Sequence, residues 1–153
     1  MAFVDLQKAY DTVPLNMLWP CLERQQIPRV YIHAAKKLYC GGTSAVKVGN
    51  EVSKEFEVTR GLRQGCSLSP PLFKIFLERA LNDWKRKCGG MGIPIDDEVL
   101  YTLLFADDQV LLATDRDDIS YMLRKLKEEY NKWGPNYKHP KDRIHDTKMT
   151  KAT

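Results

Sequence analysis

Apolar positions recur along the chain with two different periods, and each change of period marks a predicted element. Ala2–Leu6 is a short apolar run, typical of a buried strand, that carries a carboxylate at Asp5. Leu15–Arg24 places its leucines and Trp19 on one helical face, and Val30–Tyr39 predicts a second helix. The chain therefore opens with one strand followed by two helices.

The middle of the chain predicts a hairpin and a long helix. Ser44–Val48 and Glu55–Thr59 alternate apolar and polar residues around Gly49–Asn50. After the loop Gly61–Ser69, two prolines open a helix that runs to about Arg86. The positions expected to be buried on that helix are Leu72, Ile75, Phe76, Leu77, Ala80, Leu81 and Trp84.

The last third predicts two apolar strands and a final helix. Val99–Ala113 is an apolar stretch interrupted by Asp107 and Asp108, and Asp117–Trp133 has helical periodicity. The predicted order is β-α-α-β-β-α-β-β-α, an α+β fold with an antiparallel or mixed sheet packed on helices. We take residues 1–133 as the folded domain and residues 134–153 as a weakly ordered basic tail.

Composition excludes several classes of protein. The chain has 153 residues, 43% apolar and 29% charged, which is typical of one globular domain. It has no apolar run of 18 residues and no pattern typical of a secretory signal, so we expect no membrane partner. Its four cysteines form no CxxC pair, which favours reduced thiols and an intracellular location, nuclear or cytoplasmic.

The charge is unevenly distributed. The net charge is +4, but residues 96–118 hold eight acids and one base, so this segment carries −7 and the rest +11. An acidic spot on a basic body suits a cation site beside a polyanion. For residues 96–98 and 115–118, solvated loops are the simpler interpretation.

Two adjacent aspartates are costly inside an apolar hairpin. A tight turn explains one of Asp107 and Asp108, whereas a bound divalent cation explains both. Asp5 has the same unusual placement at the end of an apolar strand. If the strand ends are neighbours in the sheet, three carboxylates converge and can hold two Mg²⁺ ions about 3.5–4 Å apart. Separate turn aspartates are the alternative.

Three ordered segments resemble the motifs of reverse transcriptases. Residues 3–13 (FVDLQKAYDTV) resemble motif A, residues 61–73 (GLRQGCSLSPPLF) motif B and residues 105–108 (FADD) motif C. The sequences of these motifs are most similar to those of non-LTR (LINE-type) retrotransposon enzymes, and group II intron enzymes are more distant. The resemblance spans about residues 2–133 and implies the polymerase palm, with no counterpart here of the fingers and thumb and no endonuclease domain.

The resemblance implies a role for each carboxylate. Asp5 and Asp107 are the expected ligands of both metal ions, with the Leu6 backbone carbonyl as a further donor and Asp108 as an auxiliary carboxylate. Two Mg²⁺ ions are expected, with Mn²⁺ as an alternative. They would lower the pKa of a primer 3′-hydroxyl and neutralise the triphosphate. Asp11 is interpreted as a helix cap outside this set.

Further residues are assigned to substrates by the same resemblance. Tyr10 is expected beside the 2′ position of the incoming dNTP, and Gln64 and Gly65 beneath the nascent base pair. Arg63 and Phe105 are expected to contact the DNA primer and RNA template. The simpler alternatives are a packing aromatic at Tyr10 and an ordinary turn at Gly65.

The motif D region departs from the family pattern. Lys141 falls at the position of the family's candidate general acid for pyrophosphate, but Pro135, Lys138 and Asp142 break the surrounding pattern. We predict an RNA-directed DNA polymerase fragment, weakly active or inactive alone. The alternative is a non-catalytic retrotransposon remnant or a domesticated RNA-binding module. An unrelated phosphohydrolase would need histidines or carboxylates placed differently.

Overall fold

The computed structural model describes residues 1–6, 8–105, 108–133 and, for the backbone, 143–144. The chain divides into two compact units, each of which is described by itself. The first unit joins Met1–Ala9 to everything from Glu78 onward, and the second is Tyr10–Leu77.

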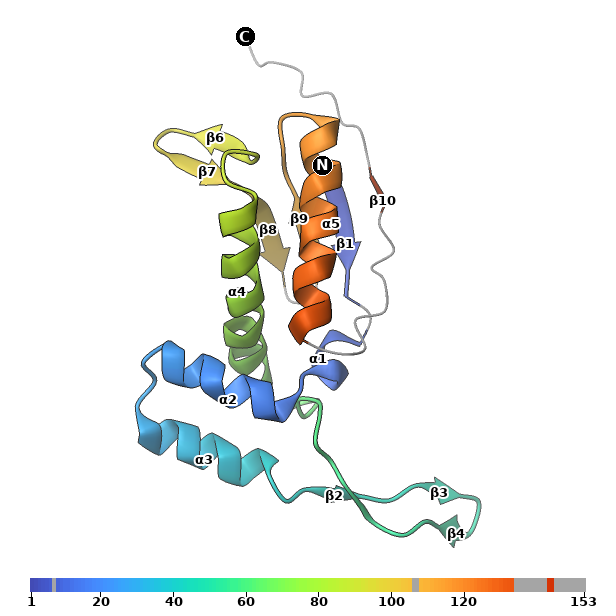
Figure 1. Ribbon diagram of the computed structural model, residues 1–153. Helices are drawn as coiled ribbons and strands as arrows, with labels where there is room; N and C mark the ends of the chain where they lie inside the picture. Colours follow the sequence, from blue (N-terminus) through green and yellow to red (C-terminus); the bar gives the residue numbers. More distant parts are fainter. Residues whose placement is uncertain (7, 106–107, 134–142, 145–153) are drawn as a thin grey trace. The chain divides into compact units, whose positions relative to one another are not determined.

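The first unit is built on a four-stranded antiparallel sheet in the order β10-β1-β9-β8. Its strands are β1 (Ala2–Asp5), β8 (Thr102–Phe105), β9 (Asp108–Leu111) and β10 (Arg143–Ile144). Burial alternates along β1, as expected for a sheet covered on one face only. This sheet and its helices confirm the predicted α+β class (Figure 1).

Helix α5 (Arg116–Trp133) and the C-terminal part of α4 (Ser69–Lys87) provide the core against this sheet (Figure 1). Trp84, Leu111, Met122 and Tyr130 are almost fully buried, and burying side chains of this size contributes about 1.5–3 kcal/mol each. The Trp84 indole donates a hydrogen bond to the Met122 carbonyl at 2.9 Å. This bond satisfies the only polar atom that Trp84 brings into the core.

The buried face predicted for α4 is largely confirmed. Leu72, Phe76, Leu77, Ala80, Leu81 and Trp84 are buried. Ile75 is only half-buried, and Phe73, which the pattern did not select, is 2% exposed. On α5, Trp133 is also half-buried, because it lies at the last helical residue.

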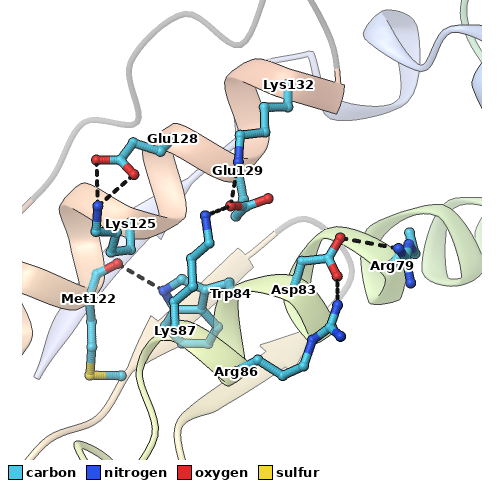
Figure 2. A network of polar contacts seen from close by, with 10 residues as sticks. All are labelled: Arg79, Asp83, Trp84, Arg86, Lys87, Met122, Lys125, Glu128, Glu129 and Lys132. Carbon is cyan, nitrogen blue, oxygen red and sulfur yellow. Dashed lines mark hydrogen bonds and ion pairs between the residues drawn. The ribbon is translucent and has the colours of Figure 1, made fainter.

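A buried carboxylate ties the two helices together. Glu129 of α5 is 2% exposed and is bound by Lys87 of α4 and by Lys132, the latter at 2.9 Å (Figure 2). Burial raises the pKa of Glu129, but the hydrogen bonds from Lys87 and Lys132 outweigh it, so the pKa lies below its ordinary value. The apolar periodicity of α5 did not predict a buried acid there.

Besides the N-terminal part of α4, the second unit holds three helices and an irregular hairpin. Its helices are α1 (Ala9–Thr12, whose first residue belongs to the first unit), α2 (Leu15–Arg24) and α3 (Arg29–Tyr39). Asp11 lies inside α1, and Pro14, not an acid, occupies the N-cap of α2, so the cap role expected of Asp11 is wrong.

The hairpin around Gly49–Asn50 is confirmed, but its ladder is broken into two short pairs. β3 (Lys47–Val48) pairs with β4 (Glu51–Val52), and β2 (Thr43–Ser44) pairs with β5 (Phe56–Glu57). All eight strand residues are exposed, so no buried face imposes continuous pairing.

Two strand features were not predicted. A hairpin of β6 (Ile93–Ile95) and β7 (Glu98–Leu100) lies between α4 and β8, and β10 lies in the tail segment. The proline inside β6 and its length of three residues weaken the period-two signal. The four cysteines all lie in the described ranges, and none of them forms a disulfide.

Candidate active site

Asp5 and Asp108 lie directly opposite each other in the sheet. They are register partners at the end of the β1–β9 ladder, where β1 ends and β9 begins. Opposed residues in an antiparallel pair have Cα atoms about 4.5–5.5 Å apart and side chains on the same face. Both residues are exposed, so the two carboxylates share the open face of the sheet.

Two predicted site residues lie outside the described residues, namely Asp107 and Lys141. Leu6, whose carbonyl is the predicted further donor, directly follows Asp5 and is 2% exposed. In the part of the chain that the structure describes, no group of three or more acidic, histidine or cysteine side chains lies close enough to hold a metal ion. The described donors at this edge are thus the Asp5 and Asp108 carboxylates.

The open face beside the carboxylates is apolar. Phe105 is the register partner of Asp108 in β8 and is 83% exposed. Leu103 and Phe3 continue the same face and are 54% and 46% exposed. This exposed apolar surface beside two acids can pack against an organic ring.

In the second unit, the motif B segment is bound along the motif A helix. The Leu62 amide donates to the Tyr10 carbonyl at 2.8 Å, and the Gly61 amide donates to the Val13 carbonyl at 2.9 Å. The Gln64 side-chain amide donates to the Asp11 carboxylate at 3.3 Å. Tyr10 and Gln64, predicted from motifs about fifty residues apart, therefore lie in one neighbourhood.

Tyr10 is held by a ring contact. Its ring stacks on Phe73 with the centroids 4.6 Å apart and an interplanar angle of 22°. It is half-exposed, so one part of the ring packs and another part faces outward. This geometry agrees with the simpler interpretation of a packing aromatic and leaves a free edge for a ligand.

Hydrogen bonds from Ser69 hold the loop around Gln64 in place. Tyr39 and Ser69 share a buried hydrogen bond of 2.8 Å, and the Ser69 hydroxyl donates to the Arg63 carbonyl at 2.7 Å. The Arg63 guanidinium lies 5.7 Å from the centre of the Tyr39 ring. Gly65 has a φ of 79°, the left-handed region that favours glycine, with open space where a side chain would stand.

A surface pocket of about 540 Å³ lies in the same unit, where α2 ends and α3 begins. None of the predicted site residues lines it; Gln26, Pro28 and Ile32 are among those that do.

Sequence analysis missed one polar residue next to the predicted carboxylates. Gln109 follows Asp108 in β9 and is 1% exposed. Its side chain is hydrogen bonded to Tyr130 of α5 and Thr102 of β8. An amide directly before the apolar run Val110–Leu112 was the available signal, because a buried polar group needs partners.

One family of proteins matches almost the whole chain. The family of reverse transcriptases (RNA-dependent DNA polymerases) matches residues 1–150, so the chain belongs to this family. The family predicted from the three motifs is therefore confirmed.

The relatives that it matches are proteins of transposable elements. The chain is 28% identical over 125 residues to the Retrovirus-related Pol polyprotein from type-2 retrotransposable element R2DM of Drosophila melanogaster, covering 82% of this chain and 12% of that protein. It is 28% identical over 127 residues to the Pol polyprotein of the type-1 element R2 of Nasonia vitripennis, with shares of 83% and 12%. It is 27% identical over 116 residues to the Transposon TX1 149 kDa protein of Xenopus laevis, with shares of 76% and 9%.

These relatives agree with the predicted non-LTR retrotransposon type. The chain spans about an eighth of the length of the first two. Within the described residues, no helix is both long and apolar enough to cross a membrane.

Proposed function

We propose that this chain is the palm of an RNA-directed DNA polymerase, which adds a dNTP to a primer 3′-hydroxyl by two-metal-ion nucleotidyl transfer. The observation that carries the proposal is the register pair of Asp5 and Asp108 at the open edge of the sheet. Motif A and motif C contribute one carboxylate each to this pair in a chain of the reverse transcriptase family.

The donors suit Mg²⁺. Hard divalent cations take carboxylate and carbonyl oxygens, and Asp5, Asp108 and the Leu6 carbonyl offer only such atoms. Two like charges directly opposite in a sheet repel, so this pair is unfavourable without a cation. Asp107, between Phe105 and Asp108 in the sequence, is the proposed third carboxylate. Bound metal ions would supply Lewis-acid stabilisation of the attacking and leaving oxygens.

The chain's other predicted residues are proposed to position substrates. The outward edge of Tyr10 would exclude a 2′-hydroxyl on the incoming nucleotide. Gln64 and Gly65 would contact the nascent base pair, and Arg63 a backbone phosphate. Phe105 offers its exposed ring to the primer end. Lys141 stays a proposal as the proton donor to pyrophosphate.

The test is single-nucleotide incorporation on an RNA template with a DNA primer, in Mg²⁺ and in Mn²⁺. We expect slow incorporation, because positioning of both strands supplies much of the rate and the chain spans only 12% of its relatives. Asp5→Asn and Asp107→Asn should abolish it.

Asp97→Asn is the matched control, since it removes the same charge at an exposed residue to which no site role is assigned. Equal loss in all three variants would contradict the assigned roles. No incorporation by the unaltered chain, combined with retained RNA binding, would favour the RNA-binding module.

A further inference from the structure

A buried hydrogen-bond chain connects three elements directly behind the carboxylates. The Tyr130 hydroxyl of α5 donates to Gln109 Oε1 at 2.6 Å. Gln109 Nε2 donates to the Thr102 hydroxyl of β8 at 3.1 Å, and Thr102 donates to the Val110 carbonyl at 2.9 Å. Tyr130 and Gln109 are each 1% exposed.

The position of Gln109 in the sheet places these hydrogen bonds next to the proposed site. Gln109 is the register partner of Val4 in β1 and of Leu104 in β8. The next pairs along the ladder are Asp5 with Asp108 and Phe105 with Asp108. Gln109 is thus the last inward-facing residue of β9 before the carboxylate edge.

Apolar patterning alone specifies this register weakly. β8 carries Leu103, Leu104 and Phe105 in succession, and β9 ends with Val110 and Leu111, which Leu112 follows in the sequence. If β9 shifted by one residue against its neighbours, a different set of apolar side chains would face the core. The same shift would move Asp108 from the open face to the buried face. Gln109 opposes such a slip, because carrying its side chain to the open face would break its hydrogen bonds to the Tyr130 hydroxyl and to Thr102.

We propose that Gln109, held by Tyr130 and Thr102, is a positioning residue that fixes the register of β9 and so keeps Asp108 and Asp5 on one face for metal binding. This inference rests on the proposed function, since it assigns a purpose to the carboxylate edge. Gln109 touches no substrate and acts through the strand that it holds. Its amide suits the role because one end accepts from Tyr130 while the other donates to Thr102.

The test measures Mn²⁺ affinity, using the electron paramagnetic resonance signal of free Mn²⁺, alongside the thermal unfolding midpoint, for the full chain. The informative variant is Gln109→Leu combined with Tyr130→Phe, which removes the central bond without leaving either partner unsatisfied. Tyr130→Phe alone removes only a hydroxyl and is the milder second variant. Leu126→Val, one turn earlier on α5 and 1% exposed, is the matched control for lost packing.

We expect the double variant to raise the Mn²⁺ dissociation constant by about 10- to 100-fold, the usual effect of removing groups that orient metal ligands. Tyr130→Phe should raise it several-fold. Leu126→Val should lower the unfolding midpoint and leave the affinity unchanged.

Two outcomes would overturn the proposal in distinguishable ways. If the unaltered chain binds Mn²⁺ and Asp5→Asn does not, but both network variants bind within twofold of the unaltered chain, the positioning role is wrong and the metal site stands. If the unaltered chain and Asp5→Asn bind equally, the carboxylate site itself is wrong, and the positioning role falls with it.

Discussion

At the scale of single residues, Gly65 carries a constraint from the backbone alone. Its φ of 79° lies in the left-handed region, and, apart from Gly65 itself and its two chain neighbours, no described residue has an atom within 4 Å of the place where a Cβ would stand. Gly61 has a φ of 90° and a second constraint, because a Cβ there would lie 3.1 Å from the Asp11 carbonyl oxygen. A substitution at Gly65 therefore carries only a conformational cost, whereas one at Gly61 carries both a conformational and a steric cost.

Gly65→Ala should destabilise the chain by about 1–2 kcal/mol, the cost of a left-handed conformation for an L-residue. Gly61→Ala should cost more, since it adds a close backbone contact. Gly65→Asn is the control, because asparagine tolerates this conformation. Urea unfolding at one temperature measures all three, and equal losses for Gly65→Ala and Gly65→Asn would contradict the conformational explanation.

The site residues differ in how far the sequence could predict them. Asp5 and Asp108 were predicted because a carboxylate at the end of an apolar strand is unusual, and the register pairs them. Gln109 was missed because its partners Thr102 and Tyr130 lie seven and 21 residues away. A hydrogen bond across elements depends on packing that no local pattern encodes.

At the scale of elements, α4 and α5 are joined by both apolar packing and an ionic cluster. Glu129 accepts from Lys87 and Lys132, while Lys125 binds Glu128 at 2.8 Å nearer the start of α5 (Figure 2). The side chain of Glu129 is 3% exposed, whereas that of Glu128 is 43% exposed. Only the Glu129 carboxylate is shielded from solvent, so its ion pairs should contribute more to stability than the Lys125–Glu128 pair.

Glu129→Gln should lower the free energy of unfolding at pH 7 by about 1.5–3 kcal/mol, the usual range for hydrogen bonds to charged groups. Glu128→Gln, the exposed neighbour, should cost less than about 1 kcal/mol.

The pH dependence of that loss has a definite sign. The folded-state pKa of Glu129 is lowered, so its contribution is present above the ordinary value of 4.5 and is lost as the pH falls through the folded-state pKa. The difference in stability between the unaltered chain and Glu129→Gln should therefore shrink below about pH 4.5. A difference that stays constant from pH 7 to pH 3 would contradict the ionic role.

The long elements were predictable and the short ones were not. α2, α4 and α5 have enough turns for an apolar period to be visible, and their predicted bounds agree with the structure within a residue or two. β6 and β7 have three residues each, and β10 has two. Such strands exist through pairing with a neighbour rather than through their own sequence, as the β1–β10 pair illustrates.

At the scale of the whole molecule, the first unit exposes an apolar sheet face. Phe3, Leu103 and Phe105 are 46%, 54% and 83% exposed on one side of the sheet. Contiguous exposed apolar surface promotes association. The chain spans only 12% of the length of the two R2 relatives.

Leu103→Thr should reduce self-association while changing stability by less than about 0.5 kcal/mol, because it lies on the open face. Val48→Thr, at an exposed strand position that is not on this face, is the matched control and should leave association unchanged. Light scattering against concentration measures both. Equal effects of the two substitutions would show that the sheet face has no special role.

The most direct test of the carboxylate site is thermal unfolding with and without millimolar Mg²⁺, comparing the unaltered chain with Asp5→Asn and Asp11→Asn. Without metal, Asp5→Asn should unfold at a higher temperature, because it removes repulsion from Asp108. With Mg²⁺ at 100 times its dissociation constant, the unaltered chain and Asp11→Asn should gain about 2.7 kcal/mol, or about 5–10 °C, and Asp5→Asn should gain little. An unfolding midpoint that does not change with Mg²⁺ would contradict a metal site at the Asp5–Asp108 edge. An equal rise of the midpoint in Asp5→Asn would contradict it as well.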